Sequence, residues 1–298
     1  MDDIIKLKNI SEYNTMRGIE TLHPLVSVYD LSGMRLIPTV RAHFGFYCVF
    51  LKEAICGDLK YGCNYYDYQE GTLVFIGPGQ IVGIGNIPGN PHPKGWALLF
   101  HPDLIRGTSL GHNIKEYSFF SYETNEALHL SEKERQLILD CLNKIDYELH
   151  QSIDKHSKKL IANNIELFLN YCLRFYDRQF ITRSLVNKDI LVRFENLLGN
   201  YLKSEMTKTI GLPTVKYCAD QLHLSANYFG DLIKKETGKS AQEHVQLKLI
   251  DIAKERIFDT SKSISEIAYE LGFKHPQHFS RMFKNETGQT PIEYRSLN

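Results

Sequence analysis

Residues 264–288 have the sequence Ile264-Ser-Glu-Ile-Ala-Tyr-Glu-Leu-Gly-Phe-Lys-His-Pro-Gln-His-Phe-Ser-Arg-Met-Phe-Lys-Asn-Glu-Thr-Gly288. The same pattern of apolar, small and charged residues occurs earlier, with Val215 lying 49 residues before Ile264 and Gly238 lying 50 before Gly288. The matching residues of the first copy are Val215, Cys218, Ala219, Leu222, Leu224, Phe229, Leu232, Ile233, Lys234, Glu236, Thr237 and Gly238. Self-similarity at a fixed period marks a duplicated supersecondary unit, whose second copy has a turn one residue longer.

Each copy has the residues expected of a helix-turn-helix, at about 214–238 and 263–288. A small residue, Ala219 or Ala268, stands where the first helix must approach the second. Helix signals agree with this, since Ser225 is a good N-cap and Pro276 suits the first helical position. The remaining signals are C′ glycines at Gly238 and Gly288, turn residues His223 and Gly272 at positions of positive φ, and capping boxes at Ser240/Glu243, Ser263/Glu266 and Thr290/Glu293.

The outward positions of the second helix of each copy are predicted to contact DNA. Recognition helices place their N-terminal residues against base edges in the major groove. Arg281 suits a guanine and Gln277 an adenine, while Lys234 and Lys284, later on the helix, suit phosphates. The complete predicted set is Ser225, Asn227, Tyr228, Lys234, Lys235, Gln277, His278, Ser280, Arg281 and Lys284. The competing interpretation is that these helices only pack against other protein.

The distribution of charged residues favours modest affinity for DNA and unequal roles of the two copies in base recognition. The whole chain has 35 Lys+Arg and 35 Asp+Glu, and Glu205–Asn298 has thirteen against twelve. Positive charge must therefore be sorted onto one face if this region binds DNA. Gly230 and Asp231 offer no donor to guanine, so we expect the second copy to carry more of the base recognition.

Residues 210–298 resemble the C-terminal domain of the AraC-type transcription regulators. The matching signature is Ile264–Phe273, followed by Phe279-Ser-Arg-Met-Phe-Lys284 and Gly288-Gln-Thr-Pro-Ile-Glu-Tyr-Arg295. The resemblance implies two helix-turn-helix subdomains joined by a rigid helix, which enter successive major-groove segments on one face of DNA. It also implies an N-terminal cupin-like effector or dimerisation domain, and activation as the commoner outcome.

The first part of the chain has the composition of a β domain. Residues 1–125 hold fourteen of the 20 glycines and seven of the 10 prolines. From Ala42 to Leu51 the apolar residues alternate, which predicts one strand with Phe44, Phe46, Cys48 and Phe50 on one face. Short strands between Gly/Pro turns favour a small β-barrel or jelly roll.

From Ser131 onward the period becomes helical. Ser131 and Glu134 form a capping box, and a later helix has Ile161, Ile165, Phe168, Cys172 and Phe175 in a coiled-coil-like seam. Packing within the chain and packing with a second chain are both open explanations of that seam. The sequence thus predicts an α+β multidomain protein. Its parts are a cupin-like β effector or dimerisation domain at 1–125, a helical linker or dimerisation region at 126–204 and an all-α double helix-turn-helix domain at 205–298.

The β domain contains one candidate ligand site, and its sequence predicts no metal site. His43, Tyr47, Tyr66 and Trp96 are the residues expected to stack on or bond to a small effector such as a sugar, although an aromatic core or surface explains them equally well. No His-x-His accompanies His43, so no metal is predicted. The six cysteines show no CxxC spacing and are expected to be buried thiols.

We expect a cytoplasmic transcription regulator, since the chain has neither a secretory signal nor an apolar run of membrane-spanning length. No catalytic residue and no cofactor is predicted, because the Gly-x-Ser-x-Gly match at Gly107–Gly111 lacks the strand and helix of a nucleophile elbow. Double-stranded DNA, RNA polymerase, a small effector and a second copy of the chain are the expected partners. The alternatives are a ligand-independent regulator whose β domain only dimerises or binds a partner, and an enzyme with a DNA-binding tail.

Overall fold

The computed structural model describes residues 4–38, 40–52, 71–84, 94–122, 126–182 and 184–297. The chain forms two compact units, residues 1–182 and 183–298. The first unit contains β1 (Ile4–Leu7), α1 (Ile10–Arg17), β2 (Val26–Asp30), η1 (Leu31–Gly33), β3 (Val40–Phe44), β4 (Tyr47–Lys52), β5 (Thr72–Ile76), β6 (Ile81–Ile84), β7 (Gly95–Phe100), α2 (Pro102–Ile105), α3 (Ser109–Asn113), η2 (Ile114–Glu116), η3 (Ser118–Ser121), β8 (Leu128–His129), α4 (Glu132–Leu149) and α5 (Ser157–Thr182). The second contains α6 (Ser184–Lys203), α7 (Met206–Thr209), α8 (Val215–Gln221), α9 (Ala226–Thr237), α10 (Ala241–Ile257), α11 (Ile264–Glu270), α12 (Pro276–Thr287) and α13 (Pro291–Leu297).

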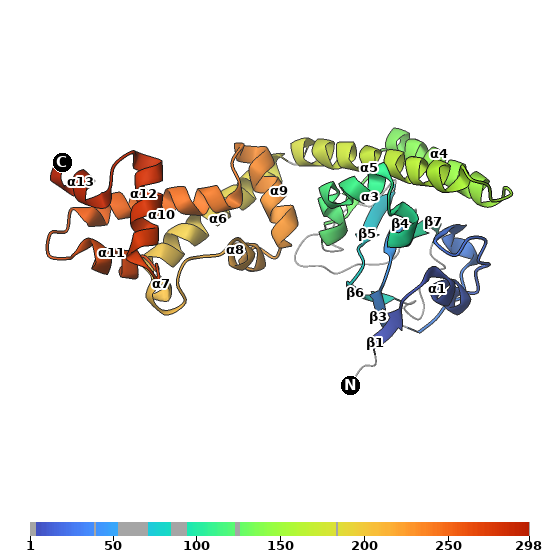
Figure 1. Ribbon diagram of the computed structural model, residues 1–298, viewed down its shortest axis with the longest axis horizontal. Helices are drawn as coiled ribbons and strands as arrows, with labels where there is room; N and C mark the ends of the chain where they lie inside the picture. The colour runs from blue at the N-terminus through green and yellow to red at the C-terminus, as the bar shows by residue number, and fades with distance from the viewer. Residues whose placement is uncertain are drawn as a thin grey trace. The chain divides into compact units, whose positions relative to one another are not determined.

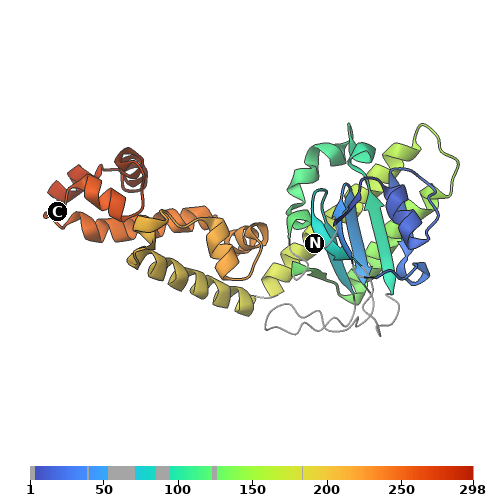
Figure 2. The same ribbon diagram turned by 90° about the horizontal axis from the view of Figure 1, so that it is seen from below.

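The strands of the first unit form two sheets (Figures 1 and 2). Their strand orders are β1-β3-β6 and β2-β7-β4-β5-β8. Only the β1–β3 pair is parallel among the strand pairs of the described residues. Among these residues no ladder joins the two sheets into a closed barrel. The chain is therefore a mixed α+β protein, and the cupin-like jelly roll stays a prediction.

The single strand predicted from Ala42 to Leu51 is wrong, because it is divided into β3 and β4, which lie in different sheets. The division occurs at Gly45, whose N–H donates to the Leu7 carbonyl at 2.8 Å. A Cβ on Gly45 would lie 2.9 Å from the Lys8 carbonyl oxygen, so only glycine allows the β1 backbone to approach this closely. Phe44 nevertheless belongs with Phe46 and Cys48 to one buried core.

Helices α4 and α5 lie side by side against the first unit's strands (Figure 1). The capping box Ser131/Glu134 begins α4, as predicted. The predicted seam of α5 is at most 5% exposed within the single chain; its residues are Ile161, Ile165, Phe168, Cys172 and Phe175. Packing inside the chain therefore accounts for that seam.

Contacts divide the predicted linker region 126–204 between the two units. Helices α4 and α5 pack with the sheets, whereas α6 packs with the helix-turn-helix region. Phe194 of α6 is fully buried and its ring centroid lies 4.9 Å from that of Phe229. The predicted boundaries and the dimerisation role of this region stay predictions.

Helix α10 runs beside α6 and joins the two helix-turn-helix copies (Figures 1 and 2). It begins with the predicted capping box of Ser240 and Glu243. Among the described helices, none combines the length and the low polarity that a lipid bilayer would require.

Candidate nucleic-acid interface

Two helix-turn-helix units are present, α8–α9 and α11–α12, and their turns have the same hydrogen bonds. The Leu224 N–H donates to the Ala219 carbonyl at 3.0 Å, and the Phe273 N–H donates to the Ala268 carbonyl at the same distance. The residue preceding each donor is left-handed, with φ 58° at His223 and 93° at Gly272. Both turns are therefore Schellman motifs, and the predicted positive φ at these two positions is confirmed.

Close packing makes glycine necessary only in the second turn. A Cβ at Gly272 would lie 2.9 Å from the Thr207 carbonyl oxygen and from the Gly211 carbonyl carbon. His223 carries a side chain at the equivalent position and is exposed. The two copies thus share a backbone geometry but differ in what packs against the turn.

The predicted caps are present and fix where the helices begin and end. The Ser225 hydroxyl accepts from the Tyr228 N–H at the start of α9, and Gly238 and Gly288 end α9 and α12 in the left-handed conformation. The capping box of Ser263 and Glu266 begins α11. Hydrogen bonds from the Ser263 backbone N–H and hydroxyl lower the pKa of the Glu266 carboxyl, which keeps it ionised near the helix N-terminus.

The inner faces of the recognition helices form the cores of the two copies. Phe229, Leu232 and Ile233 of α9 are fully buried, as are Phe279 and Phe283 of α12.

Tyr228 was predicted to lie on the outward face of its helix, but the structure corrects this, because its side chain is only 6% exposed. It lies one turn before the buried Leu232, so the helical period places it beside the core stripe. The free protein therefore does not present the Tyr228 ring to DNA, although the residue was expected to be a contact.

Helix α12 presents a stripe of exposed polar side chains on its outer face. Gln277, Arg281 and Lys284 are exposed and stand at positions i, i+4 and i+7. None of them has a side-chain hydrogen bond or ion pair with the residues that the structure describes. His278 is also exposed, with its ring 5.4 Å from that of His275, whereas Ser280 is half-buried. These donors are free to bind acceptors supplied by a ligand.

Helix α9 has a different outer face. Asn227, Lys234 and Lys235 are exposed, and the half-buried Asp231 occupies the position equivalent to Arg281. A carboxylate there accepts hydrogen bonds but repels phosphate. Of the predicted contacts, the structure therefore leaves a carboxamide and two lysines exposed on α9.

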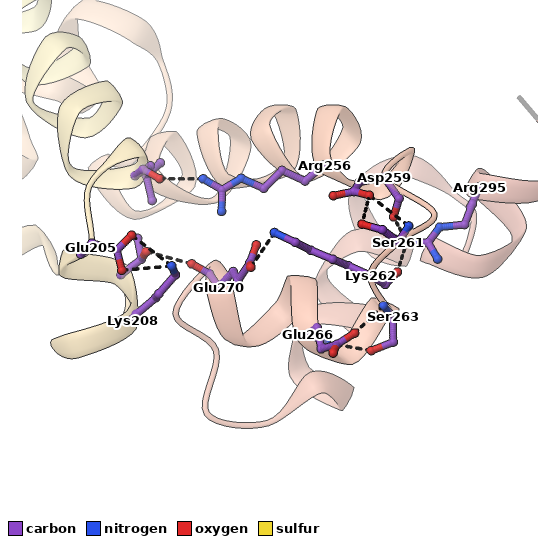
Figure 3. A network of polar contacts seen from close by, with 12 residues as sticks. Glu205, Lys208, Arg256, Asp259, Ser261, Lys262, Ser263, Glu266, Glu270 and Arg295 are labelled. Atoms are coloured by element: carbon purple, nitrogen blue, oxygen red, sulfur yellow. Dashed lines mark hydrogen bonds and ion pairs between the residues drawn. The ribbon is translucent and has the colours of Figure 1, made fainter.

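Long-range polar contacts hold the second copy in place (Figure 3). Lys262 pairs with Glu270 at 2.7 Å, and the Arg256 Nη2 donates to the Leu202 carbonyl at 3.1 Å. Arg295 of α13 donates to the carbonyls of Ile257 and Lys262. These positioning residues were not predicted, because no local pattern marks them and the partners of Arg256 and Arg295 are at least 33 residues away in the sequence.

The predicted effector residues are not brought together by the described structure. His43 lies in β3 of the three-stranded sheet, whereas Tyr47 and Trp96 lie in the five-stranded sheet. The Tyr47 ring stacks on Phe100, with centroids 4.8 Å apart, and burial raises the pKa of its phenol. Tyr66 lies outside the described residues.

The cysteines and Ser109 are the other residues that the sequence analysis considered, and they lie in both units. Cys48, Cys141, Cys172 and Cys218 are free and buried, as predicted, and Cys56 and Cys63 lie outside the described residues. Ser109 begins the short helix α3, and its hydroxyl donates to Glu166 at 2.8 Å.

Comparison with known proteins found one matching family model and several similar relatives. The model of a helix-turn-helix domain family matches residues 218–296. The transcriptional regulatory protein YesN of Bacillus subtilis is 37% identical over 109 residues, which are 34% of this chain and 30% of YesN. The transcriptional activator RhaS of Enterobacter sp. is 27% identical over 161 residues, 54% of this chain and 55% of RhaS. The match therefore spans less than two thirds of either relative.

The TetD protein of transposon Tn10 from Escherichia coli is 31% identical over 144 residues, which cover 48% of this chain and 91% of TetD. The family match at residues 218–296 and the signature of residues 264–295 fall on the paired helix-turn-helix units described above. The chain belongs to the AraC-type family of DNA-binding transcription regulators.

Proposed function

We propose that α9 and α12 enter adjacent major-groove segments of double-stranded DNA and that the chain recognises a specific operator. The exposed stripe of Gln277, Arg281 and Lys284 carries this proposal, because its side chains are unpaired on a helix whose opposite face is core. Arg281 would bind a guanine through two hydrogen bonds and Gln277 an adenine. Each such pair discriminates against the wrong base by about 1–3 kcal/mol.

The lysines and the polar residues near the helix N-termini would position the protein on the sugar-phosphate backbone of DNA. Lys234, Lys235 and Lys284 lie later on their helices and suit phosphates. Ser225, Asn227, His278 and Ser280 stand at or near the helix N-termini, where they would approach the edge of the groove. Because Asp231 replaces arginine in α9, the second copy would supply most of the base preference.

Selection of binding sites from a random oligonucleotide pool tests this division. Arg281→Ala is expected to relax the preference at one position of the selected site. Lys284→Ala is expected to weaken binding to all sequences about equally and to reduce the salt slope by about one unit. Equal loss on every sequence for Arg281→Ala, or no preference by the unaltered chain, would refute the proposal.

We further propose that the first unit senses a small effector, with a sugar among the candidates, and that two chains bind one operator in the cytoplasm. Effector binding would change how the two chains of a homodimer orient their recognition helices, so that the helices of both chains reach DNA half-sites at the correct spacing. Activation through contact with RNA polymerase is the expected outcome, and the similar protein RhaS is a transcriptional activator.

A melting-temperature screen of the full chain with a sugar library tests effector sensing, because a ligand that binds only the folded state raises the melting temperature. A binding compound should also change operator affinity or dimer geometry. If compounds bind without either effect, or none binds, the first unit serves only dimerisation or partner binding. Turnover abolished by Ser109→Ala or His43→Ala would instead favour an enzyme.

A further inference from the structure

The first unit contains a buried arginine, Arg17, that has no counter-charge among the described residues. Arg17, in the last turn of α1, is 4% exposed. Its Nη1 donates a long hydrogen bond of 3.5 Å to the Arg35 carbonyl, and its Nε has no partner among the described residues. None of the ion pairs among the described residues includes Arg17. Its guanidinium carbon lies 5.7 Å from the centroid of the Tyr13 ring.

The polar neighbours of Arg17 do not supply negative charge. Burial raises the pKa of the Tyr13 phenol, and it raises the pKa values of the Tyr29 phenol and the Cys48 thiol well above their ordinary values. All three groups therefore stay protonated and neutral at ordinary pH. The cluster keeps the positive charge of Arg17 in a buried, weakly polarisable environment, where a charge is costly unless it is paired.

A further unpartnered polar atom comes from α1 itself. The Asn14 Oδ1 is buried without a hydrogen-bond partner among the described residues, whereas the Tyr29 hydroxyl on β2 has the Tyr13 hydroxyl as its polar neighbour. Asn14 faces β2, because its Nδ2 donates to the Ser27 hydroxyl at 3.3 Å. Buried polar groups are nearly always paired in folded proteins, so the unpartnered Arg17 Nε and Asn14 Oδ1 of α1 indicate an absent partner.

The side chains that surround Tyr13 and Arg17 indicate the chemistry of the rest of the ligand. The rings of Phe44 and Phe46 pack around Tyr13, at centroid distances of 6.0 and 6.3 Å. Partly buried side chains of Met16, Ile19 and Ile37 pack against the same core. A ligand that pairs with Arg17 would therefore place an apolar body among apolar and aromatic side chains.

Arg35 marks the solvent side of this cluster. It is exposed, its N–H donates to the Arg17 carbonyl at 2.7 Å, and it has no ion pair with the described residues. Two unpaired guanidinium groups at one corner would attract an approaching anion.

We propose that the first unit binds a small organic carboxylate between α1 and β2, with Arg17 as the residue that pairs with the carboxylate. This inference rests on the proposed effector-sensing function, and it replaces a neutral sugar by an anion with an apolar body.

Thermal unfolding of the full chain tests the ligand class. The probes are short and medium-chain aliphatic and aromatic monocarboxylates, each paired with its primary amide, together with inorganic phosphate. At ten times its Kd, a binding carboxylate should raise the melting temperature by about 3–6 °C, whereas its amide and phosphate should not. Equal shifts with carboxylate and amide, an equal shift with phosphate, or no shift with any carboxylate would overturn the proposal.

Substitutions test the residue. Arg17→Met should abolish the carboxylate shift while leaving the ligand-free melting temperature unchanged or higher, because it removes an unpaired buried charge. The matched control Arg35→Met should keep the shift, and Arg17→Lys, which keeps the charge, should keep a weaker one. A full shift in Arg17→Met would overturn the role of Arg17. If Arg17→Met is destabilised, Arg17→Lys decides instead: a folded Arg17→Lys chain that has lost the shift would also overturn that role.

Two further readouts separate this proposal from the proposed function. A sugar that shifts the melting temperature and alters operator affinity, when no carboxylate does, would overturn the carboxylate and leave effector sensing intact. Ligand-free Arg17→Met should bind the selected operator with the same salt slope as the unaltered chain. Loss of operator preference in the unaltered chain would be a failure of the DNA-binding proposal instead.

Discussion

The two helix-turn-helix copies have the same backbone but different outer faces. Both turns are Schellman motifs, and both recognition helices bury aromatic or aliphatic side chains on their inner faces. On the outside, the carboxamide and lysine of α12 are matched in α9, but Arg281 is matched by Asp231. Packing constrains the inner face of a duplicated unit, whereas the outer face is free to take a different chemical role.

The turns offer the largest expected difference between the copies. Gly272→Ala should destabilise α11–α12 by roughly 2–4 kcal/mol, because a side chain at positive φ would also collide with the backbone of residues 207 and 211. His223→Gly should change the stability of α8–α9 by less than about 1 kcal/mol. Hydrogen exchange of the four helices in the full chain measures both effects, and equal losses in the two copies would contradict the asymmetry.

Gln277 and Asn227 provide a matched pair for base recognition, since both are exposed carboxamides at the same helical position. Gln277→Ala is expected to cost about 1–3 kcal/mol of discrimination at one base pair. Asn227→Ala should cost less, because its helix lacks the arginine that would fix the register. Competition binding with single-base operator variants measures this, and a larger loss for Asn227→Ala would reverse the assignment of the two copies.

The smallest expected difference between the copies is in the acid sensitivity of their first helices, α8 and α11. Glu266 has a lowered pKa in the folded chain, so its stabilisation is present above its ordinary value of 4.5 and is lost as pH falls through the lowered value. The start of α8 is capped by Thr214, which accepts from the Tyr217 N–H and involves no carboxylate.

Exchange protection of α11 should therefore fall in acid in the unaltered chain, and the difference from Glu266→Gln should vanish there. Thr214→Ala should weaken α8 by about 1 kcal/mol at every pH, which makes it the matched control. An acid dependence of α8 as steep as that of α11 would show that the caps are not its cause.

Local signals predicted the second unit well. Capping boxes, C′ glycines and the apolar period are properties of neighbouring residues, so they placed the helices and turns without tertiary information. Tyr228 shows where such reasoning ends, because a residue at the edge of an apolar stripe is buried or exposed according to what packs beside it.

The first unit was less predictable, because strand pairing depends on residues far apart in the chain. Alternation correctly grouped Phe44, Phe46 and Cys48, but it did not show that Gly45 would bend the strand against β1. The same limit applies to His43, Tyr47 and Trp96, which alternation could not assign to sheets.

The sequence by itself determined that this chain carries two helix-turn-helix units and that Gln277, Arg281 and Lys284 lie on the exposed face of α12, because helical periodicity and capping are local. Only the tertiary structure decided that α6 packs with the helix-turn-helix units, that Arg256 and Arg295 hold the second copy, and that Arg17 is buried with no counter-charge among the described residues. Those features arise from contacts between distant segments, and burial of a charge is a property of the packed chain and not of its neighbours in sequence.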